Sequence, residues 1–278
     1  MVKVSIVGGL GNQLFQYAFG RAISEKYGED LYLDLFYIKK GNFFKSMTVR
    51  SFDLDNYSIN SKKMSILDSL LLRNFSLKNK FIEEDTFFDK SVFINHFDWF
   101  VGYWQSYKYF NDIRDKLLVE LTPKKLSSNS IKSVQQIAKC NSVSVHIRRG
   151  DYLNKTNSNF FFDLVNSNYY KDAINLVSEK VKKPVFFVFS DDLSWVKSNM
   201  NFGKNKINFV DFNGYKNAFE DMYLMSKCKH NIIANSTFSW WGAWLNQNKN
   251  ALIISPKKWF SDKKKSTKDL IPKNWVRI

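Results

Sequence analysis

Two adjacent arginines follow a short run of alternating apolar and polar residues in SVSVHIRRGDY, residues 142–152. The alternation is typical of a β-strand. A guanidinium group presents a planar fork of N–H donors that matches phosphate oxygens, so Arg148 and Arg149 are candidates for binding a phosphorylated ligand. The alternative is a surface ion pair between an arginine and Asp151. His146 could act as a general base, but we favour a hydrogen-bonded structural role for a histidine inside a strand.

Two neighbouring acids end the next apolar run, in FSDD, residues 189–192. Asp191 and Asp192 could bind a metal ion, recognise a base or a ribose, or cap a helix. Asp192 precedes LSWVK, which makes it a good helix N-cap. The carboxylates are adjacent rather than separated by one residue, so the sequence gives little support for a metal site.

Three hydroxyl groups and an amide cluster at the start of NSTFSWWGAWL, residues 235–245. The apolar run before them indicates a strand, and the tryptophan-rich run after them indicates a helix. A helix N-terminus offers free N–H groups and the positive end of the helix dipole. Capping needs one hydroxyl, so we interpret the cluster as a cradle for a diphosphate, completed by Arg148 across the sheet. Its members are Asn235, Ser236, Thr237 and Ser239.

A glycine-rich loop, GGLG at residues 8–11, follows the first apolar run of the chain. A dinucleotide-binding loop needs a further glycine where this chain has Leu14, although Asp34 lies near the position of a ribose-binding acid. A tight turn between a strand and a helix explains the loop equally well. At the start of that helix, Asn12 and Gln13 could donate side-chain hydrogen bonds to a ligand.

Strands that alternate with helices must position these residues. In the first half, a strand over 2–7, a helix over 12–27 and a strand over 30–35 form the usual start of a parallel sheet. Residues 40–130 mix short helical and extended patches with many aromatics. The second half alternates more regularly, with strands predicted over 142–147, 185–189, 207–212, 231–235 and 251–254 and helices over 168–181, 192–200, 216–229 and 238–247.

This alternation predicts an α/β fold with doubly wound parallel sheets. Both halves begin in the same way, so we expect two Rossmann-like domains, residues 1–130 and residues 131–278, joined within the polar stretch 124–132. Ligands of such sheets bind outside the carboxyl ends of the strands. The polar residues at the strand ends are therefore the candidates for a binding site.

The amino-acid composition limits the classes of protein to which the chain can belong. The chain has 278 residues, 44% of them hydrophobic, which allows a sizeable core and excludes a disordered chain. A net charge of +16 suits a solvated basic surface, a nucleic acid, a phosphorylated ligand or an anionic membrane surface. Two cysteines and three histidines give neither a disulfide framework nor a zinc pattern. Without a signal-peptide pattern or a bilayer-spanning apolar run, we expect a cytoplasmic protein, with peripheral contact at the inner face of the membrane left open.

The combination of motifs resembles the bacterial α1,2-fucosyltransferases. The resemblance implies an inverting enzyme that moves L-fucose from GDP-β-L-fucose to the 2-hydroxyl of a galactose in a bacterial surface glycan of the O-antigen type. It also implies two Rossmann-like domains that face a cleft, the GT-B arrangement, and neither a cofactor nor a metal. The segments that carry it run in order through nearly the whole chain: GGLGNQLFQYAFGRA (8–22), YWQSYKYF (103–110), HIRRGDY (146–152), FSDD (189–192) and NSTFSWWGAWL (235–245).

The resemblance also assigns roles. Arg148, helped by the helix N-terminus at 236–239, would neutralise the charge that grows on the departing diphosphate. Asp191 or Asp192 would bind the guanine or the ribose, and Asp151 would hold the arginine loop. The C-terminal domain would thus bind the donor. The N-terminal domain would bind a galactose-terminated oligosaccharide, free or lipid-linked, through Gly9, Asn12, Gln13, Tyr103, Trp104 and Gln105.

Three questions stay open at this point. The general base for the acceptor hydroxyl is either His146 or absent, as in a strongly dissociative transition state. A nicotinamide-dependent oxidoreductase would use the glycine loop and Asp34, but Leu14 argues against it. A basic nucleic-acid-binding protein would explain the charge, yet the aromatics fall mostly at apolar-face positions. The basic segment KKWFSDKKKSTK, residues 257–268, could equally meet anionic lipid.

Overall fold

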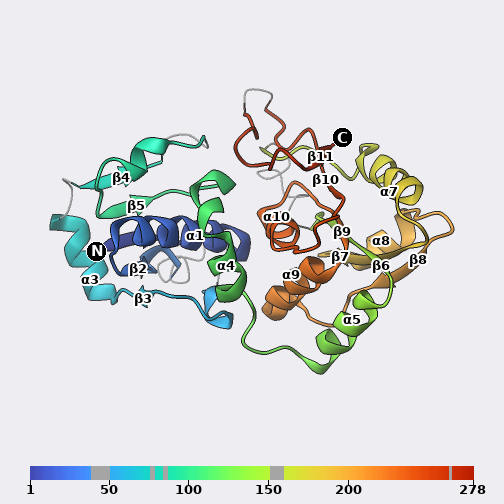
Figure 1. Cartoon of the computed structure of the whole chain (residues 1–278), viewed down its shortest axis with the longest axis horizontal. Coiled ribbons are helices and arrows are strands. Elements are labelled where there is room, and N and C mark those ends of the chain that lie inside the picture. Colours follow the sequence, from blue (N-terminus) through green and yellow to red (C-terminus); the bar gives the residue numbers. More distant parts are fainter. Residues whose placement is uncertain (39–50, 76–78, 84–86, 151–159, 263–264) are drawn as a thin grey trace. The chain divides into compact units, whose positions relative to one another are not determined.

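The chain forms two compact units (Figure 1). The computed structural model describes residues 1–38, 51–75, 79–83, 87–150, 160–262 and 265–278. Unit 1 consists of Met1–Lys124 with Lys268–Pro272, and unit 2 consists of Lys125–Thr267 with Lys273–Ile278. The first division falls at 124/125 rather than at the expected 130/131, because helix α5 (Ser128–Ala138) packs within unit 2.

A short C-terminal segment, Lys268–Pro272, belongs to unit 1, although the sequence assigned it to the second domain. Asp269 holds it there, because its carboxylate pairs with the Lys108 ammonium and accepts a hydrogen bond from the Phe88 N–H at 3.1 Å. The Ser106 hydroxyl donates to the Asp269 carbonyl oxygen at 2.8 Å. These partners lie at least 161 positions apart in the chain, so no local sequence pattern could have indicated the contact.

Unit 1 is built on a five-stranded sheet in the order β3-β2-β1-β5-β4, and all its neighbouring pairs are parallel. Helix α1 connects β1 to its neighbour β2, which confirms the predicted β-loop-α-β start. The strands are β1 (Val2–Ser5), β2 (Leu31–Asp34), β3 (Lys62–Lys63), β4 (Lys80–Ile82) and β5 (Trp99–Val101). The helices are α1 (Leu10–Tyr27), α3 (Ile66–Phe75) and α4 (Arg114–Glu120), with 3₁₀ turns η1 (Asp53–Asn56), η2 (Lys90–Phe93), η3 (Tyr107–Tyr109) and η4 (Asn111–Ile113).

Aromatic packing fixes the 103–110 segment against α1. The Trp104 ring stacks on the Phe19 ring with a centroid distance of 3.9 Å and an interplanar angle of 5°. The Tyr109 ring meets the same Phe19 ring edge-on at 5.1 Å. Buried aromatic pairs of this kind add about 0.5–1.5 kcal/mol beyond their area burial, so the aromatics that obscured the sequence pattern here are core residues.

Unit 2 is built on a six-stranded sheet in the order β11-β10-β9-β6-β7-β8, again with parallel neighbouring pairs. The predicted strands are all present, but β8 and β9 each end three residues before their expected ends. The strands are β6 (Asn141–Ile147), β7 (Pro184–Ser190), β8 (Lys206–Phe209), β9 (His230–Ile232), β10 (Ile253–Ser255) and β11 (Val276–Arg277). The helices that follow α5 are α7 (Tyr169–Lys180), α8 (Leu193–Asn199), η6 (Tyr215–Asn217), α9 (Ala218–Lys227) and α10 (Thr237–Trp244).

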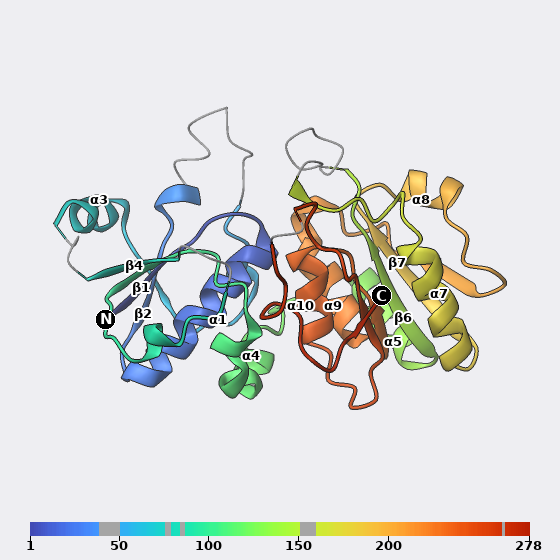
Figure 2. The same cartoon turned by 90° about the horizontal axis from the view of Figure 1, so that it is seen from above.

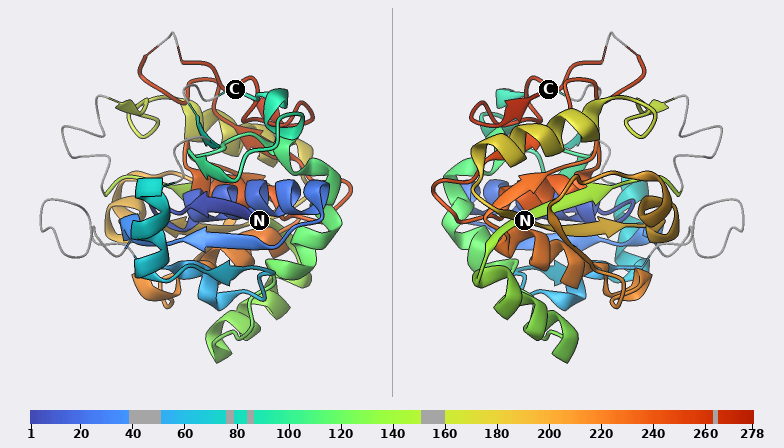
Figure 3. Two further views of the ribbon diagram at one scale, coloured as in Figure 1. Left: turned by 90° about the vertical axis from the view of Figure 1, so that its left-hand side faces the viewer. Right: turned by 90° about the vertical axis from the view of Figure 1, so that its right-hand side faces the viewer.

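Helices cover both faces of the unit 2 sheet (Figures 2 and 3). Successive side chains of a strand point to opposite faces, and β7 follows this rule: Phe186 and Val188 pack with α7, while Phe187 and Phe189 pack with α5 and α9. A strand buried on both faces reads as a continuous apolar run, which is why β7 could be predicted from PVFFVF.

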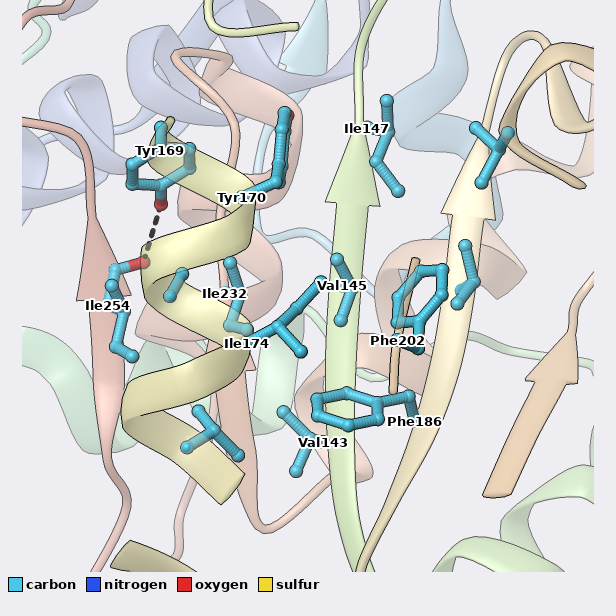
Figure 4. Close-up of a cluster of buried hydrophobic side chains, with 14 of the residues drawn as sticks. Val143, Val145, Ile147, Tyr169, Tyr170, Ile174, Phe186, Phe202, Ile232 and Ile254 are labelled. Carbon is cyan, nitrogen blue, oxygen red and sulfur yellow. Dashed lines mark hydrogen bonds between the residues drawn. The ribbon is translucent and has the colours of Figure 1, made fainter. Parts of the chain in front are cut away.

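Figure 4 shows the cluster on the α7 face, where Ile174 of α7 packs against strand residues such as Val143 and Val145. Helix α7 is also tied to the strands by a hydrogen bond. The Tyr169 hydroxyl donates to the carbonyl oxygens of Ile233 at 2.6 Å and Ile254 at 3.2 Å. The bond fixes the start of α7 near the carboxyl ends of β9 and β10, the edge at which ligands of parallel sheets bind.

Candidate active site

The ends of β6 and β7 bring the two arginines and the two aspartates together. In the register of this strand pair, Ile147 lies opposite Ser190, so the residues that follow each strand leave the sheet at the same level. The Arg148 guanidinium lies 3.1 Å from a carboxylate oxygen of Asp191. The sequence considered Asp151 as the partner of the arginines, but Asp151 lies outside the described residues.

Asp191 shapes the loop after β6 as well as pairing with its arginine. Its two carboxylate oxygens accept hydrogen bonds from the N–H groups of Arg149 at 2.9 Å and Gly150 at 3.0 Å. A Cβ atom on Gly150 would lie 3.0 Å from Asp191 Oδ2, closer than ordinary contact. The glycine of this motif therefore allows the carboxylate to approach the backbone.

Arg149 makes a second, parallel pair. Its guanidinium lies 2.5 Å from a carboxylate oxygen of Asp192 and 4.7 Å from the centre of the Trp195 ring. Asp192 is also the N-cap of α8, since its other oxygen accepts a hydrogen bond from the Trp195 N–H at 3.1 Å. The capping alternative for Asp192 is thus present, and it coexists with the ion pair.

His146 is buried in the sheet layer, with 4% of its surface exposed. Its ring lies 5.4 Å from the Phe238 ring of α10, and its carbonyl oxygen accepts a hydrogen bond from the Tyr170 hydroxyl at 3.0 Å. The ring contact puts the first turn of α10 beside the end of β6, next to Arg148. A role for His146 as general base stays a prediction.

Two of the three hydroxyls at the start of α10 make local hydrogen bonds. Ser236 is the N-cap and accepts from the Phe238 N–H at 3.3 Å. The buried Ser239 hydroxyl approaches the carbonyl oxygens of Ala234 and Ser236 at 3.4 and 3.3 Å. The half-buried Thr237 hydroxyl has no partner within the part of the chain that the structure describes, so it is the best placed of the three to bind a ligand.

Asn235 joins two loops. Its side-chain nitrogen donates to the carbonyl oxygens of Phe162 and Trp259, each at 2.9 Å. Both amide hydrogens are therefore used inside unit 2, and the side chain is 1% exposed. This position holds the loops beside α10, and the expected direct contact between Asn235 and a donor stays a prediction.

In unit 1, Gln13 has a structural role and Asn12 remains more accessible. The fully buried Gln13 amide donates to the carbonyl oxygens of Gly8 and Ser51 and accepts from the Asp53 N–H, at 2.8–2.9 Å. Asn12 is half-buried, and its side-chain oxygen accepts a hydrogen bond from the Gln105 side chain at 3.0 Å.

The two motif segments of unit 1 thus meet where Asn12 contacts Gln105. Gly9, the N-cap of α1, precedes this contact and makes no side-chain capping bond. Two of the six residues expected to bind the acceptor are therefore joined directly by a hydrogen bond.

The turn that carries Tyr103 and Trp104 is held by Glu83, a residue that the sequence did not single out. The Glu83 carboxylate accepts hydrogen bonds from the Tyr103 N–H at 2.6 Å and the Trp104 N–H at 3.0 Å. Burial raises the pKa of Glu83, and the two N–H donors oppose that shift. Trp104 is buried with a positive φ of 56°, whereas Tyr103 is 46% exposed and can reach a ligand.

Asp34, the candidate ribose-binding acid of the oxidoreductase hypothesis, is fully buried. Its carboxylate accepts hydrogen bonds from the Ser5 and Ser69 hydroxyls at 3.1 and 2.8 Å and from the Phe36 N–H at 3.0 Å. These three donors lie inside unit 1, so Asp34 stabilises the sheet rather than presenting a carboxylate to a ligand.

Two adjacent acids at the start of α9, the buried Glu220 and the half-buried Asp221, were also not identified from the sequence. Burial raises the pKa of Asp221 to about 7, and Asn213 donates a hydrogen bond to it at 2.6 Å. The neighbouring Glu220 accepts from the Ser127 N–H and hydroxyl at 2.9 and 2.7 Å. Two adjacent acids were visible in the sequence, but they lie within the apolar pattern of helix α9 rather than at the end of a strand, so the rule on strand ends did not select them.

Two further observations concern metals and membranes. Among the residues that the structure describes, no group of three or more His, Cys, Asp or Glu side chains could hold a metal ion. Within the same part of the chain, no helix has both the length and the apolar character required to span a bilayer.

Comparison with known proteins identifies the family. The model of glycosyl transferase family 11 matches residues 50–278. All of the chain aligns with 99% of an α-1,2-colitosyltransferase of Escherichia coli at 36% identity. Over 98% of each chain, it is 31% identical to the O-antigen biosynthesis glycosyltransferase WbnK of Escherichia coli. A shorter match, also 31% identical, joins 37% of this chain to 28% of galactoside α-(1,2)-fucosyltransferase 1 of Saimiri boliviensis boliviensis.

The paired strand-end arginines and the α10 N-terminus thus occur in a chain whose full-length relatives carry the names of glycosyltransferases. The family model covers most of the sequence and includes both of these motifs. The chain therefore belongs to glycosyl transferase family 11.

Proposed function

We propose that the enzyme transfers L-fucose from GDP-β-L-fucose to the 2-hydroxyl of a galactose, with inversion at the anomeric carbon. The observation that carries this proposal is the fixed Arg148 guanidinium at the carboxyl edge of unit 2, held by Asp191 beside the first turn of α10. A guanidinium and a helix N-terminus at one edge suit a diphosphate. The resemblance of the motifs to α1,2-fucosyltransferases supplies the sugar and the linkage.

The proposed reaction requires stabilisation of the negative charge that develops on the leaving group, GDP. The bond between the anomeric carbon and the β-phosphate oxygen breaks, and the electron pair stays on GDP. Arg148, Thr237 and the N–H groups of α10 would stabilise the negative charge that develops there, because preorganised donors are most effective where charge grows. Such a cation could make a metal unnecessary, and we propose that none is required.

The acceptor oxygen then forms the new bond from the opposite face, giving an α-fucoside, and its proton leaves to a base or to solvent. We assign acceptor binding to unit 1, where Asn12 contacts Gln105 and the exposed Tyr103 side chain lies two residues before Gln105. A phenol ring and amide groups suit a sugar, which offers apolar ring faces and hydroxyls. This division of donor and acceptor binding assumes that the two domains face each other across a cleft. That arrangement also stays a prediction.

The names of the relatives support a proposal for the acceptor. WbnK is named for O-antigen biosynthesis, so we propose a galactose-terminated oligosaccharide of a bacterial surface glycan as the acceptor. Such a substrate would be met in the cytoplasm, free or on a lipid carrier.

A second donor is favoured by one observation. The relative that is 36% identical over the whole chain is named a colitosyltransferase, and colitose is L-fucose without its 3-hydroxyl. A site that hydrogen-bonds this hydroxyl would reject colitose by about 10⁴-fold or more, whereas a site that only encloses the sugar would discriminate far less. The ratio of kcat/KM for the GDP esters of the two sugars decides between these donors.

The test is a transfer assay with purified protein, EDTA and a panel of β-galactosides, in which GDP release and product mass are followed for each donor. We expect GDP release together with a galactoside that gains one fucose, and loss of both products when the galactose 2-hydroxyl is replaced by hydrogen. If GDP-fucose neither binds nor is cleaved and the colitose ester is used, the donor is wrong but the reaction class stands. Failure with both donors would overturn the proposal.

A further inference from the structure

The positive charge of this protein is concentrated in unit 2. Unit 2 contains 24 lysines and arginines against 10 aspartates and glutamates, whereas unit 1 contains 18 against 16. The net charges of +14 and +2 follow from these counts. A glycosyltransferase needs only a few cations for a nucleotide diphosphate, so the proposed donor site does not account for the excess in unit 2.

Much of this excess lies at the amino ends of the unit 2 strands, the edge opposite Arg148. Nine lysines precede or begin five neighbouring strands, and the flanking segments contribute a single acid, Glu179. Eight of the nine are exposed and Lys229 is half-buried. Within the described chain, none of their ammonium groups forms an ion pair. We call these residues the amino-end rim: Lys139, Lys180, Lys182, Lys183, Lys204, Lys206, Lys227, Lys229 and Lys249.

Sheet topology arranges the rim as a row. The strands β10, β9, β6, β7 and β8 are consecutive neighbours, and a spacing of about 4.8 Å between strands makes the row roughly 19 Å long. Asn141 links two of its members, because Lys229 Nζ donates to the Asn141 side-chain oxygen at 3.0 Å and Asn141 Nδ2 donates to the Lys182 backbone carbonyl oxygen at 2.7 Å. The sheet therefore fixes the row of backbone positions from which the lysine side chains extend.

Lys183 adds an independent observation. It has a φ of 49°, one of two positive values among the non-glycine residues that the structure describes. Glycine or asparagine adopts this left-handed conformation at lower cost than lysine. A cation therefore occupies a position just before β7 where an uncharged residue would fit the backbone better, which points to a use for the charge.

We propose that the amino-end rim is a docking surface for an anionic phospholipid bilayer. Each lysine near such a surface contributes about fivefold to binding, and flexible stems let the ammonium groups follow mobile headgroups. The rim lies at the opposite end of the strands from Arg148 and the start of α10, so docking leaves the carboxyl edge uncovered. This inference goes beyond the proposed reaction and does not depend on its donor or acceptor.

The composition of the rim favours lipid over nucleic acid. Sites for single-stranded nucleic acid combine cations with aromatic faces on which bases stack, and arginine forks are common at phosphates. The segments that carry the rim lysines, residues 139–141, 179–184, 203–206, 227–230 and 248–252, contain neither arginine nor Phe, Tyr or Trp. One aromatic ring, that of Tyr223, has its centre 4.7 Å from the Lys227 ammonium group. Binding of an oligonucleotide is accordingly an outcome that the experiment must separate from binding of vesicles.

The experiment measures co-sedimentation of the full chain with vesicles, either of phosphatidylcholine alone or of phosphatidylethanolamine with phosphatidylglycerol. We expect binding only to the anionic vesicles, and weaker binding as salt rises. The triple variant Lys180→Gln, Lys182→Gln, Lys183→Gln should lower the partition coefficient roughly 100-fold. Its GDP release in solution should match that of the native protein, because none of the three residues belongs to the proposed active site.

A matched control removes the same charge elsewhere in unit 2, through Lys257→Gln, Lys258→Gln, Lys265→Gln in the second basic segment. These lysines are exposed and lie away from the rim residues in sequence. The proposal requires the rim triple to weaken vesicle binding much more than the control triple. Equal losses would mean that net charge alone binds the membrane, and a larger loss in the control would place the docking surface at 257–265. Either result overturns the proposal, as does tighter binding of a mixed-sequence oligonucleotide that depends on the rim.

The variant Lys183→Gly tests whether Lys183 contributes to vesicle binding through its charge or serves only the fold. Glycine removes the left-handed strain together with the cation, so thermal stability should not fall while vesicle affinity falls about fivefold. A variant that keeps full vesicle affinity would show that the unusual backbone of Lys183 serves the fold alone, and the rim would lose that support.

Discussion

The Asp191 carboxylate lies 3.1 Å from the Arg148 guanidinium while it also accepts the N–H groups of the two residues that follow this arginine. One side chain from the end of β7 thus fixes both the cation and the backbone of the loop that carries it. An arginine held in this way loses little conformational entropy when a diphosphate binds, which is the condition for efficient electrostatic stabilisation.

Arg148→Ala should lower turnover about 10²–10³-fold, as expected for the loss of one donor that acts mainly in the transition state. Arg148→Lys should recover only part of this loss, because an ammonium keeps the charge but not the planar fork. Initial rates of fucose transfer at saturating donor give the comparison. Lys197→Ala is the control, since it breaks an exposed ion pair with Asp211 in the same unit. Near-native turnover in Arg148→Ala would exclude the assigned role.

Asp191→Asn should lower turnover about tenfold while the chain stays folded. The amide oxygen can still accept one of the two N–H groups, but the amide nitrogen cannot accept the other and the ion pair with Arg148 is lost. The expected signature is a fall in kcat with a smaller change in donor KM, because the arginine remains but is less well oriented. A change confined to KM would point to direct recognition of the nucleotide by Asp191.

Gly150→Ala should act through the same carboxylate. The added Cβ would lie 3.0 Å from Asp191 Oδ2, and Asp191 cannot retreat without loosening its contact with Arg148. We expect a loss of about tenfold in turnover, and this loss should not add to that of Asp191→Asn in the double variant. Additive losses would show that the alanine disturbs something other than the carboxylate.

The sequence predicted elements that have a local residue pattern, but it did not predict contacts between residues that lie far apart in the chain. Apolar runs predicted β6 and β7, and the rule on strand ends directed attention to Arg148 and Asp191. The pairing with Asp191 was not predicted, because the register of two strands brings this residue to Arg148 from 43 positions away. The sequence offers Asp151 as a partner of the arginines, and that residue lies outside the described part of the chain. Register depends on packing over the whole sheet, which a single sequence does not reveal.

Polar motif residues that hold backbone groups are the other limit. The sequence indicates ligand-binding roles for Gln13 and Asn235, and these roles stay predictions. What the sequence did not indicate is that their amides also hold the backbones of distant loops. An amide serves either purpose equally well, so residue type could not separate the two. Glu83 shows the opposite situation, since it stands outside the motifs and was not identified from the sequence, yet it holds the 103–104 turn. Its contacts depend on the pairing of β4 with β5, which a single sequence does not reveal.

Asn235→Ala should therefore act mainly on stability. The change leaves the carbonyl oxygens of Phe162 and Trp259 without this buried donor, and one unsatisfied buried group costs about 1–3 kcal/mol. Urea denaturation should show a lower free energy of unfolding by that amount. Asn166→Ala is the control, since its side chain makes an exposed hydrogen bond to Asp163. Unchanged stability together with a raised donor KM would favour the ligand-binding role instead.

Asp221 should contribute a loss of stability as the pH rises from about 4 to about 7. Burial raises the pKa of Asp221 to about 7, from the ordinary value of about 3.8 for an exposed aspartate. Between these values the folded state holds a proton that the unfolded state has lost, so each step up in pH favours unfolding until the folded carboxyl also ionises.

The full difference of about three pKa units corresponds to roughly 4 kcal/mol, and this stabilisation is present below pH 4 and absent above pH 7. Asp221→Asn keeps an acceptor for Asn213 but cannot ionise, so the fall in unfolding free energy between pH 5 and pH 8 should be smaller in the variant than in the native protein. Asp211→Asn, at an exposed carboxylate, should leave the native pH profile unchanged. Parallel profiles for the native protein and Asp221→Asn would mean that Asp221 ionises in the folded state near its ordinary pKa, with Asn213 and solvent compensating for its burial.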